Sequence, residues 1–191
     1  MVVYLETDRL LLRRMTTDDL DNLVELDGDP EVMRYLTGGA PTPRERLRDE
    51  GLPDMLAYYD RGDDFGYWAV ARRDDFLGWV GFRPDRGHGP AADVDRSGIE
   101  VGYRLRRETW GQGYATEACR ALIRKGFTEL GVERVYAETM AVNAASRRVM
   151  EKSGLRHVGT FFPDWPEAIP GAEHGEVHYA LTRDEWLSVN R

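Results

Sequence analysis

The sequence has little cysteine and no long hydrophobic run, and both shortages exclude classes of protein. Cys119 is the single cysteine in 191 residues, so no disulfide can form within the chain. Such usage is typical of a reducing compartment, and we expect a cytoplasmic protein. No stretch approaches the roughly 20 apolar residues that span a bilayer. The apolar runs near the N-terminus are also too short for a secretion signal, so we expect no membrane partner.

Basic residues are also in deficit. The chain carries 26 basic and 34 acidic side chains, which gives a net charge of −8. That sign disfavours non-specific binding of nucleic acid and would attract a cationic substrate, although it also serves solubility. A chain of 191 residues is long enough for one domain with its own core and short for two. We expect a single domain over residues 1–191, without repeats or a linker.

The first third of the chain predicts an edge strand and two helices. Residues 3–14 hold leucines among charges and read as the strand, and residues 18–27 read as an amphipathic helix. Thr42 begins a capping-box pattern that opens a second helix. We expect this second helix to be interrupted or restarted at Pro53 and to end near residue 62.

The rest of the chain alternates between strand and helix patterns. A strand–helix–strand unit pairs in parallel and hairpin strands pair antiparallel, so the sheet should be mixed, with helices on both faces. The fold class expected is α+β, that is, mixed α/β. The expected strands are 67–72, 76–83, 98–105, 134–140, 156–162 and 176–182, and the expected helices are 114–130, 143–153 and one after Thr182.

A glycine-containing turn precedes the helix at 114–130. Gly111-Gln112-Gly113 leaves backbone N–H groups open at a helix N-terminus, and Arg106 and Arg107 stand just before it. This combination predicts a phosphate-bearing ligand. A Walker A loop is excluded because its lysine is absent. A dinucleotide fingerprint lacks its third glycine, which is replaced by Thr116, but Glu138 after the next strand keeps that alternative open.

These residues resemble a known family. The stretch VGYRLRRETWGQGYATEA, followed by a strand and NAASRRVMEKSGL, is similar to the acyl-CoA-dependent N-acyltransferases of the GNAT superfamily. LETDRLLLRRMTTDDL and DPEVMRYL resemble its RimJ/RimL branch of ribosomal-protein N-acetyltransferases, so the resemblance spans nearly the whole chain. It implies a GNAT-like fold whose mostly antiparallel sheet is splayed between strands 98–105 and 134–140. Glu108 departs from the turn pattern of the family, which has Gln or Arg there.

By that resemblance, the anion at the turn is the pyrophosphate of acetyl-CoA, which acts as a co-substrate. The pantetheine arm is implied to lie along the strand at 98–105 and to reach the helix that begins at 143. The implied cofactor-binding residues are Val101, Tyr103, Leu105, Arg106, Arg107, Gly111, Gln112, Gly113, Tyr114, Ala115, Thr116 and Asn143.

Four further positions are candidates for a role in acyl transfer. An amine must lose a proton before it attacks a thioester, and Glu100 is the first candidate base because it shares a strand face with Gly102. Glu138 is the second, and is also a candidate substrate-binding residue. Ser146 matches the family position whose hydroxyl protonates the leaving thiolate. Trp165, between prolines in an acidic loop, is a candidate contact for the acceptor.

We interpret the protein as an N-acetyltransferase that moves an acetyl group from acetyl-CoA to a primary amine by direct attack in a ternary complex. The amine belongs to a protein N-terminus or to a small molecule. Two alternatives are a catalytically idle CoA-binding module and a dinucleotide-binding oxidoreductase. His174 and His178 do not match a metal-binding motif, so we expect no metal. The length of the acyl group and the oligomeric state, a homodimer included, remain open.

Overall fold

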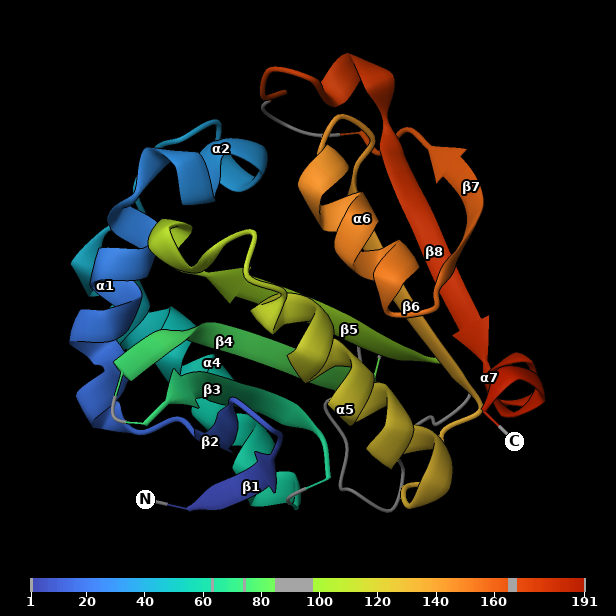
Figure 1. The fold of residues 1–191 in the computed structure, drawn as a ribbon. Helices are drawn as coiled ribbons and strands as arrows, with labels where there is room; N and C mark the ends of the chain where they lie inside the picture. The colour runs from blue at the N-terminus through green and yellow to red at the C-terminus, as the bar shows by residue number, and fades with distance from the viewer. Residues whose placement is uncertain (1, 63, 74, 85–97, 165–167, 191) are drawn as a thin grey trace.

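The fold is built on one eight-stranded sheet. The computed structural model describes residues 2–62, 64–73, 75–84, 98–164 and 168–190. The strands lie side by side in the order β1–β2–β3–β4–β5–β6–β8–β7 (Figure 1). They are β1 (Val3–Glu6), β2 (Leu11–Arg14), β3 (Gly66–Arg72), β4 (Asp75–Pro84), β5 (Ile99–Leu105), β6 (Arg134–Met140), β7 (Arg156–Phe161) and β8 (Glu176–Thr182).

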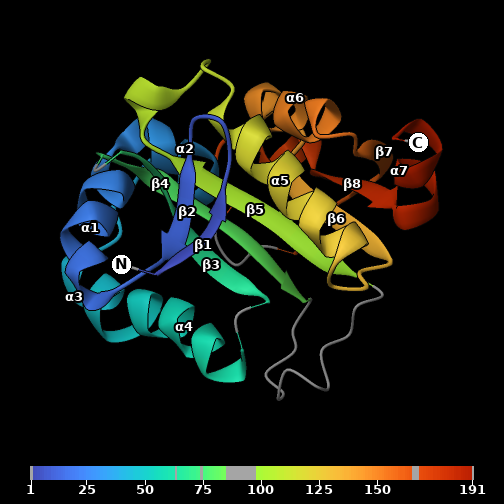
Figure 2. The same ribbon diagram turned by 60° about the horizontal axis from the view of Figure 1, so that its bottom comes forward.

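Helices cover both faces of this sheet, as predicted. On one face lie α5 (Tyr114–Thr128) and α6 (Ala144–Lys152). The helices between β2 and β3 lie on the other face, beside the half of the sheet that holds β2 to β5 (Figures 1 and 2). They are α1 (Leu20–Gly28), α2 (Pro30–Thr37), α3 (Arg44–Arg46) and α4 (Leu52–Leu56), and α7 (Arg183–Val189) follows β8. None of the helices in the described ranges combines the length and the apolar character that a bilayer crossing needs.

The alternation of side chains along β5 explains the two layers. Ile99, Val101 and Leu105 point to one face and share a buried core with α5 residues such as Leu122. A second core lies on the opposite face, where Trp79 of β4 packs against the leucines of α1. The period of two in the strands therefore places one core on each side of the sheet.

The parallel pair β5–β6 holds together for only two residues. Its registered pairs are Ile99 with Val135 and Glu100 with Tyr136. By contrast, β6 and β8 stay paired over the whole range 134–140. The other neighbouring strands of the described sheet pair antiparallel. The sheet thus parts between β5 and β6, which confirms the predicted mixed, mostly antiparallel and splayed architecture.

Two predictions for the first third of the chain are wrong in detail. Residues 3–14 form two antiparallel strands rather than one, because the Thr7 hydroxyl accepts from the Leu10 N–H (3.0 Å) and closes a turn between them. Thr42 does not cap the next helix. Its hydroxyl bonds to Asp27 Oδ2 (3.1 Å) instead, and α3 begins only at Arg44.

The predicted restart of this helix at Pro53 is confirmed, because α4 begins at Leu52. The helical path continues from Arg44 to Arg61 through a π-helical segment, Leu47–Gly51, and then through α4. Pro53 stands in the first turn of α4, where the missing N–H of proline disrupts a helix least. The interruption thus takes the form of a π-helical turn just before the proline, not of an end to the helical path.

Gly126 shows how closely α5 packs on the sheet. A Cβ at this residue would lie 2.6 Å from Cζ of Phe82, a side chain that is 0% exposed and cannot move aside. We predict that Gly126→Val lowers the free energy of unfolding by about 1–3 kcal/mol in urea titrations, because it overfills this contact. Gly28→Val at the end of α1 is the matched control, since its Cβ would meet nothing within 4 Å. Equal losses in the two variants would contradict this account.

Candidate active site

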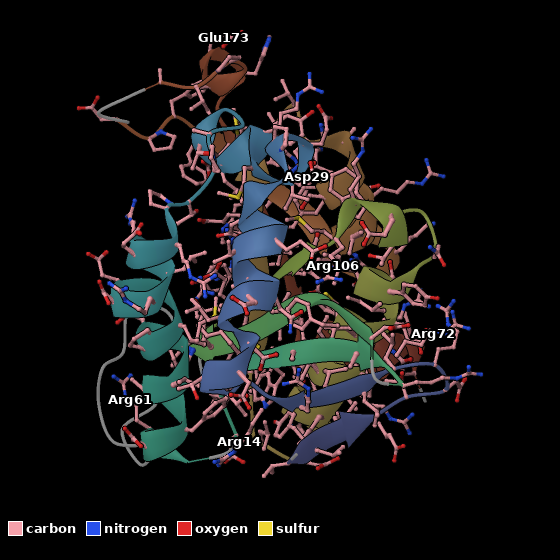
Figure 3. The ribbon with its side chains drawn as sticks, turned by 90° about the vertical axis from the view of Figure 1, so that its left-hand side faces the viewer. Arg14, Asp29, Arg61, Arg72, Arg106 and Glu173 are labelled. Atoms are coloured by element: carbon pink, nitrogen blue, oxygen red, sulfur yellow. The ribbon has the colours of Figure 1, made fainter. Side chains whose placement is uncertain are left out.

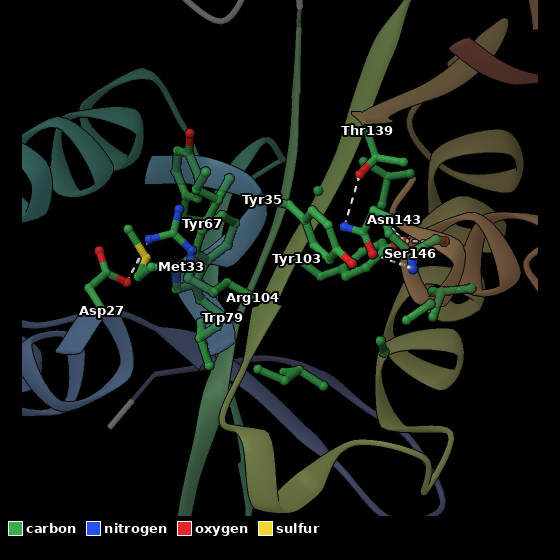
Figure 4. Close-up of a pocket in the computed structure, with 18 of the residues that line it drawn as sticks. Asp27, Met33, Tyr35, Tyr67, Trp79, Tyr103, Arg104, Thr139, Asn143 and Ser146 are labelled. Atoms are coloured by element: carbon green, nitrogen blue, oxygen red, sulfur yellow. Dashed lines mark hydrogen bonds and ion pairs between the residues drawn. The ribbon is translucent and has the colours of Figure 1, made fainter. Parts of the chain in front are cut away.

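One cleft of about 1260 Å³ connects the turn before α5 with the parting between β5 and β6. Its walls come from α2, α4, the middle of the sheet and α6, and Figure 4 shows part of them. The predicted site residues that line it are Glu100, Val101, Tyr103, Leu105, Gly111, Gly113, Tyr114, Ala115, Thr116, Glu138, Asn143 and Ser146. Candidates that are up to 46 positions apart in the chain, from Glu100 to Ser146, therefore share this cleft.

The turn before α5 has the geometry of an anion site. Gly111 and Gly113 adopt left-handed φ angles of 74° and 83°, a conformation that favours glycine. Gly113 is the N-cap of α5, and no described side chain caps this end. A Cβ at Gly111 would meet nothing within 4 Å. An uncapped helix N-terminus beside open space offers N–H donors and the positive end of the helix dipole, which suit a phosphate.

Arg9 is the arginine that the structure brings to this turn. Its Nε donates to Glu117 Oε2 (2.6 Å) in α5, and its Nη1 donates to the carbonyl oxygen of Gln112 (3.0 Å). The guanidinium also lies 4.7 Å from the ring centroid of Tyr114. Burial tends to raise the pKa of Glu117, but hydrogen bonds from Thr7 and Arg9 outweigh it and leave that pKa lowered. The connection between β1 and β2 thereby fixes the start of α5.

Arg106 does not reach the turn with its side chain, contrary to the prediction. Its guanidinium bonds to Glu25 Oε2 (2.6 Å) on α1, and Figure 3 shows it beside that helix. Arg106, Arg107 and Gln112 do not line the cleft. Sequence proximity could not indicate Arg9, because it lies more than one hundred residues before the turn.

A pair of hydroxyl groups lies on the α6 side of the parting. Tyr103 Oη is 2.9 Å from both Oγ and the carbonyl oxygen of Ser146. Asn143 caps α6, since its Oδ1 accepts from the Ser146 N–H (3.2 Å), and its Nδ2 donates to Thr139 Oγ1 (3.1 Å). Burial raises the pKa of Tyr103, so its hydroxyl stays protonated near neutral pH. Figure 4 shows Tyr103 pointing toward Ser146.

The Tyr103 hydroxyl was missed by the sequence analysis, which assigned this residue a role only through its backbone. On an alternating strand, Tyr103 falls on the apolar face and therefore reads as a core residue. Only the placement of α6 over β5 shows that its polar tip meets a serine.

Glu100 lies on the opposite face of β5 and has an arginine partner. Its Oε2 is 2.6 Å from Arg83 Nη2 on β4, and both side chains are about a quarter exposed. Arg104, four residues further along the chain and on the same face, is paired with the buried Asp27 (2.5 Å). Glu100 therefore forms an ion pair with Arg83 at the cleft.

Glu138 also lines the cleft, from β6. Its Oε1 is 2.8 Å from His178 Nδ1 on β8, and Arg134 Nη2 is 2.7 Å from His178 Nε2. The sequence analysis proposed no role for Arg134, and it interpreted His178 as a surface or substrate-pocket residue and not as a metal ligand. Within the described ranges, no group of three or more His, Cys, Asp or Glu residues could hold a metal ion.

Trp165, the predicted contact for the acceptor, lies outside the described residues, so that prediction stays open. The described part of the same loop lies beside the end of α2, because a Cβ on Gly38 would be 3.4 Å from Ile169 Cγ2. Figure 3 shows Glu173 of this loop at the same end of the molecule as Asp29, the N-cap of α2. Since α2 lines the cleft, this loop stands near its rim.

Comparison with known proteins agrees with this geometry. Residues 9–156 match the family described as Acetyltransferase (GNAT) domain. The FsC-acetyl coenzyme A-N(2)-transacetylase of Aspergillus fumigatus is 38% identical over 190 residues, which cover 98% of this chain and 79% of that protein. A GNAT-family acetyltransferase structure from Bacillus anthracis has a TM-score of 0.71 at 25% identity and covers 97% of this chain and 100% of its own. The structure of RimL, a ribosomal L7/L12 alpha-N-protein acetyltransferase, has a TM-score of 0.76 at 19% identity, with coverages of 96% and 99%, and shares the fold.

The splayed sheet, the glycine turn and the shared cleft define an acyl-CoA-dependent acyltransferase. The chain belongs to the GNAT acetyltransferase family and is an N-acetyltransferase that uses acetyl-CoA. The alternatives of an idle CoA-binding module and of a dinucleotide-binding oxidoreductase are therefore not supported. The described residues before the turn also lack the repeated βα units that the oxidoreductase would need.

The Arg9 contacts generate a prediction that needs no ligand. Arg9→Met removes the guanidinium donors to Glu117 and to the Gln112 carbonyl, so the first turn of α5 should open more often. We predict that amides 117–120, the first that donate within α5, exchange hydrogen at least about tenfold faster, measured by NMR at constant pH. Arg156→Met is the matched control, because Arg156 is 69% exposed and forms a 3.4 Å pair with Glu185. Unchanged exchange rates in Arg9→Met would show that the first turn of α5 does not depend on the contacts of Arg9.

Proposed function

We propose that the acetyl acceptor is the primary amine of a small molecule, which meets acetyl-CoA at the parting between β5 and β6. The observation that carries the proposal is the cleft itself, which reaches this parting both from the glycine turn and from the side of α2 and α4. Support also comes from the relative with 38% identity, whose printed name places the acetyl group on an N(2) nitrogen of FsC.

The glycine turn is the proposed site of the CoA pyrophosphate. Gly111, Gly113 and the first residues of α5 would supply the N–H donors, and the pantetheine arm would lie along β5 as an added strand does. After Glu100, β5 has no registered partner on the β6 side. Val101 and Tyr103 lie along this stretch and line the cleft. RimL, which shares the fold, is described in complex with coenzyme A.

The proposed chemistry uses one residue on each side of the parting. The amine nitrogen attacks the thioester carbonyl, so that a C–N bond forms and the C–S bond breaks. Glu100 takes the proton that the nitrogen loses. Ser146 Oγ gives a proton to the departing sulfur, and the Tyr103 hydroxyl, 2.9 Å away, can donate to Oγ in turn. The base, Glu100, and the proton donor, Ser146, thus act from opposite faces of β5.

A protein N-terminus, as in the RimJ/RimL branch, is the alternative acceptor. The likeness to RimL at 19% identity speaks for the fold only. We further propose that the chain works as a single domain over residues 1–191 in the cytoplasm, which its one buried cysteine supports.

An acetyl-CoA thiol-release assay tests the acceptor class. The panel is FsC, spermidine, kanamycin A and an alanyl tetrapeptide with a free N-terminus. We expect at least one small amine to have a kcat/KM about tenfold or more above that of the peptide. A preference for the peptide would assign the acceptor to protein N-termini. No release above the rate without acceptor, for any amine, would overturn the proposed function.

The proposed phosphate site predicts a selective effect at Gly113. Gly113→Ala adds a methyl group where the phosphate should approach, and at φ 83° it also strains the turn. We predict that the Kd of CoA rises at least about tenfold in calorimetric titrations, close to 1.4 kcal/mol. Gly154→Ala is the matched control, with a φ of 96° at the end of α6. It should lose similar stability and keep its affinity for CoA. An equal loss of CoA affinity in Gly113→Ala and Gly154→Ala would show that the phosphate does not bind at this turn.

The hydroxyl pair predicts a kinetic ranking. Ser146→Ala removes the proposed proton donor, and Tyr103→Phe removes only the group behind it. We predict that kcat falls about 10²–10³-fold for Ser146→Ala and about 3–10-fold for Tyr103→Phe, with the KM for acetyl-CoA within about threefold of wild type. Steady-state rates with saturating acceptor measure both. A wild-type kcat in Ser146→Ala would show that the thiolate takes its proton elsewhere.

A further inference from the structure

A row of polar side chains on β6 and β8 points away from α6. Val135 and Ala137 of β6 are buried in the core that α5 and α6 share, so their neighbours Arg134 and Glu138 point to the opposite face. His178 of β8 is the register partner of Glu138 and points to this same face. The row therefore lies on the face where the acceptor side of the cleft opens.

The contacts within the row fix the tautomer of His178. Arg134 Nη2 lies 2.7 Å from His178 Nε2, and a guanidinium can only donate, so Nε2 must accept and carries no proton. The neutral imidazole therefore holds its proton on Nδ1, which donates to Glu138 Oε1 at 2.8 Å. A proton on Nε2 would face the N–H groups of Arg134, so this nitrogen does not serve as a base.

The chain of contacts leaves one oxygen of Glu138 for the cleft. Oε1 is held by His178, whereas Oε2 has no hydrogen-bond partner among the residues that the structure describes. The Glu138 side chain is 40% exposed and lines the cleft. Tyr136 stacks on the imidazole with ring centroids 5.3 Å apart, which fixes the plane of His178. The carboxylate is thus oriented without being buried.

The position and charge of Glu138 suit a cationic group. Glu100 and Tyr136 form the last registered pair of β5 and β6, and Glu138 is the next residue of β6 on the same face. Glu100 has an arginine as its direct partner, but the direct partner of Glu138 is a neutral imidazole. Burial, and then the charge of Glu138, raise the pKa of Glu176 on the neighbouring strand. The negative charge of Glu138 therefore disfavours a second negative charge on the neighbouring Glu176.

We propose that Glu138 anchors the ammonium group of the acceptor through Oε2, and that His178 and Arg134 are positioning residues that hold this carboxylate in place. The proposal rests on the proposed function, because it requires the acceptor to approach the parting between β5 and β6. Glu138 then sets the affinity for the acceptor, and the proton of the bound ammonium passes to Glu100. This assignment gives different roles to the two candidate bases of the sequence analysis: Glu100 accepts the proton and Glu138 binds the acceptor.

Steady-state kinetics on His178 variants test this proposal, with the amine of the panel that has the highest kcat/KM. His178→Leu removes the donor to Glu138, and we expect the KM for that amine to rise about tenfold, with the KM for acetyl-CoA within about twofold. His178→Asn keeps an N–H near the place of Nδ1 and should recover most of the loss. His157→Leu on β7 is the matched control, because His157 is the register partner of Tyr179 and so belongs to the other face. It should leave both KM values unchanged.

A spectroscopic measurement tests the positioning without any turnover. In ¹⁵N-labelled protein at pH 7.5, long-range ¹H–¹⁵N spectra should show His178 as the Nδ1–H tautomer, and Arg134→Met should make the Nε2–H tautomer appear. An Nε2–H tautomer in the wild-type protein would overturn the proposal.

The two kinds of failure are distinguishable. If no amine of the panel is acetylated, the proposed function fails, and the tautomer still decides whether His178 orients Glu138. If the wild-type enzyme is active and His178→Leu keeps its acceptor KM, the anchoring role is overturned and the acetyltransferase assignment stands. A loss that His178→Asn does not recover, accompanied by a lower melting temperature, would assign His178 to sheet stability and also overturn the proposal.

Discussion

The early separation of β5 from β6 is the constraint on which the rest of this structure depends. Two strands that run in parallel normally share a continuous ladder, but here the ladder ends after Glu100 and Tyr136. Beyond that point β5 continues with β4, and β6 continues with β8 and β7. The molecule therefore consists of two half-sheets that meet at a short seam. The cleft and both groups of candidate catalytic residues follow from that seam.

The two half-sheets are held in place by contacts between distant parts of the chain. Tyr103 reaches from β5 to Ser146 at the start of α6, and so links one half-sheet to the helix that covers the other. Arg9, from the connection between β1 and β2, fixes the first turn of α5. Asp27 of α1 pairs with Arg104 of β5 in the second core. Each contact stiffens a different wall of the same cleft.

Local sequence patterns predicted most of the fold, because strand alternation, helix periodicity and glycine turns act over a few residues. The parting of the sheet was predicted only through the family resemblance. Local rules failed where a distant partner competed for a side chain. Thr42 has the sequence context of a helix N-cap, yet its hydroxyl forms a hydrogen bond with Asp27 instead. Arg106 is adjacent to the turn in sequence and pairs with α1 instead. No spacing rule links Glu138 to His178, since their contact arises from strand order.

Cys119 has a practical consequence that follows from its place on the buried face of α5. The side chain is 1% exposed, and burial raises the pKa of its thiol, so the reactive thiolate is scarce in the folded protein. A disulfide reagent added to the enzyme in turnover therefore reports the sulfur of released coenzyme and almost nothing from the protein. Over longer times the same reagent reacts with Cys119 only when α5 lifts from the sheet. The rate at which the single thiol of this chain reacts thus measures how often its core opens.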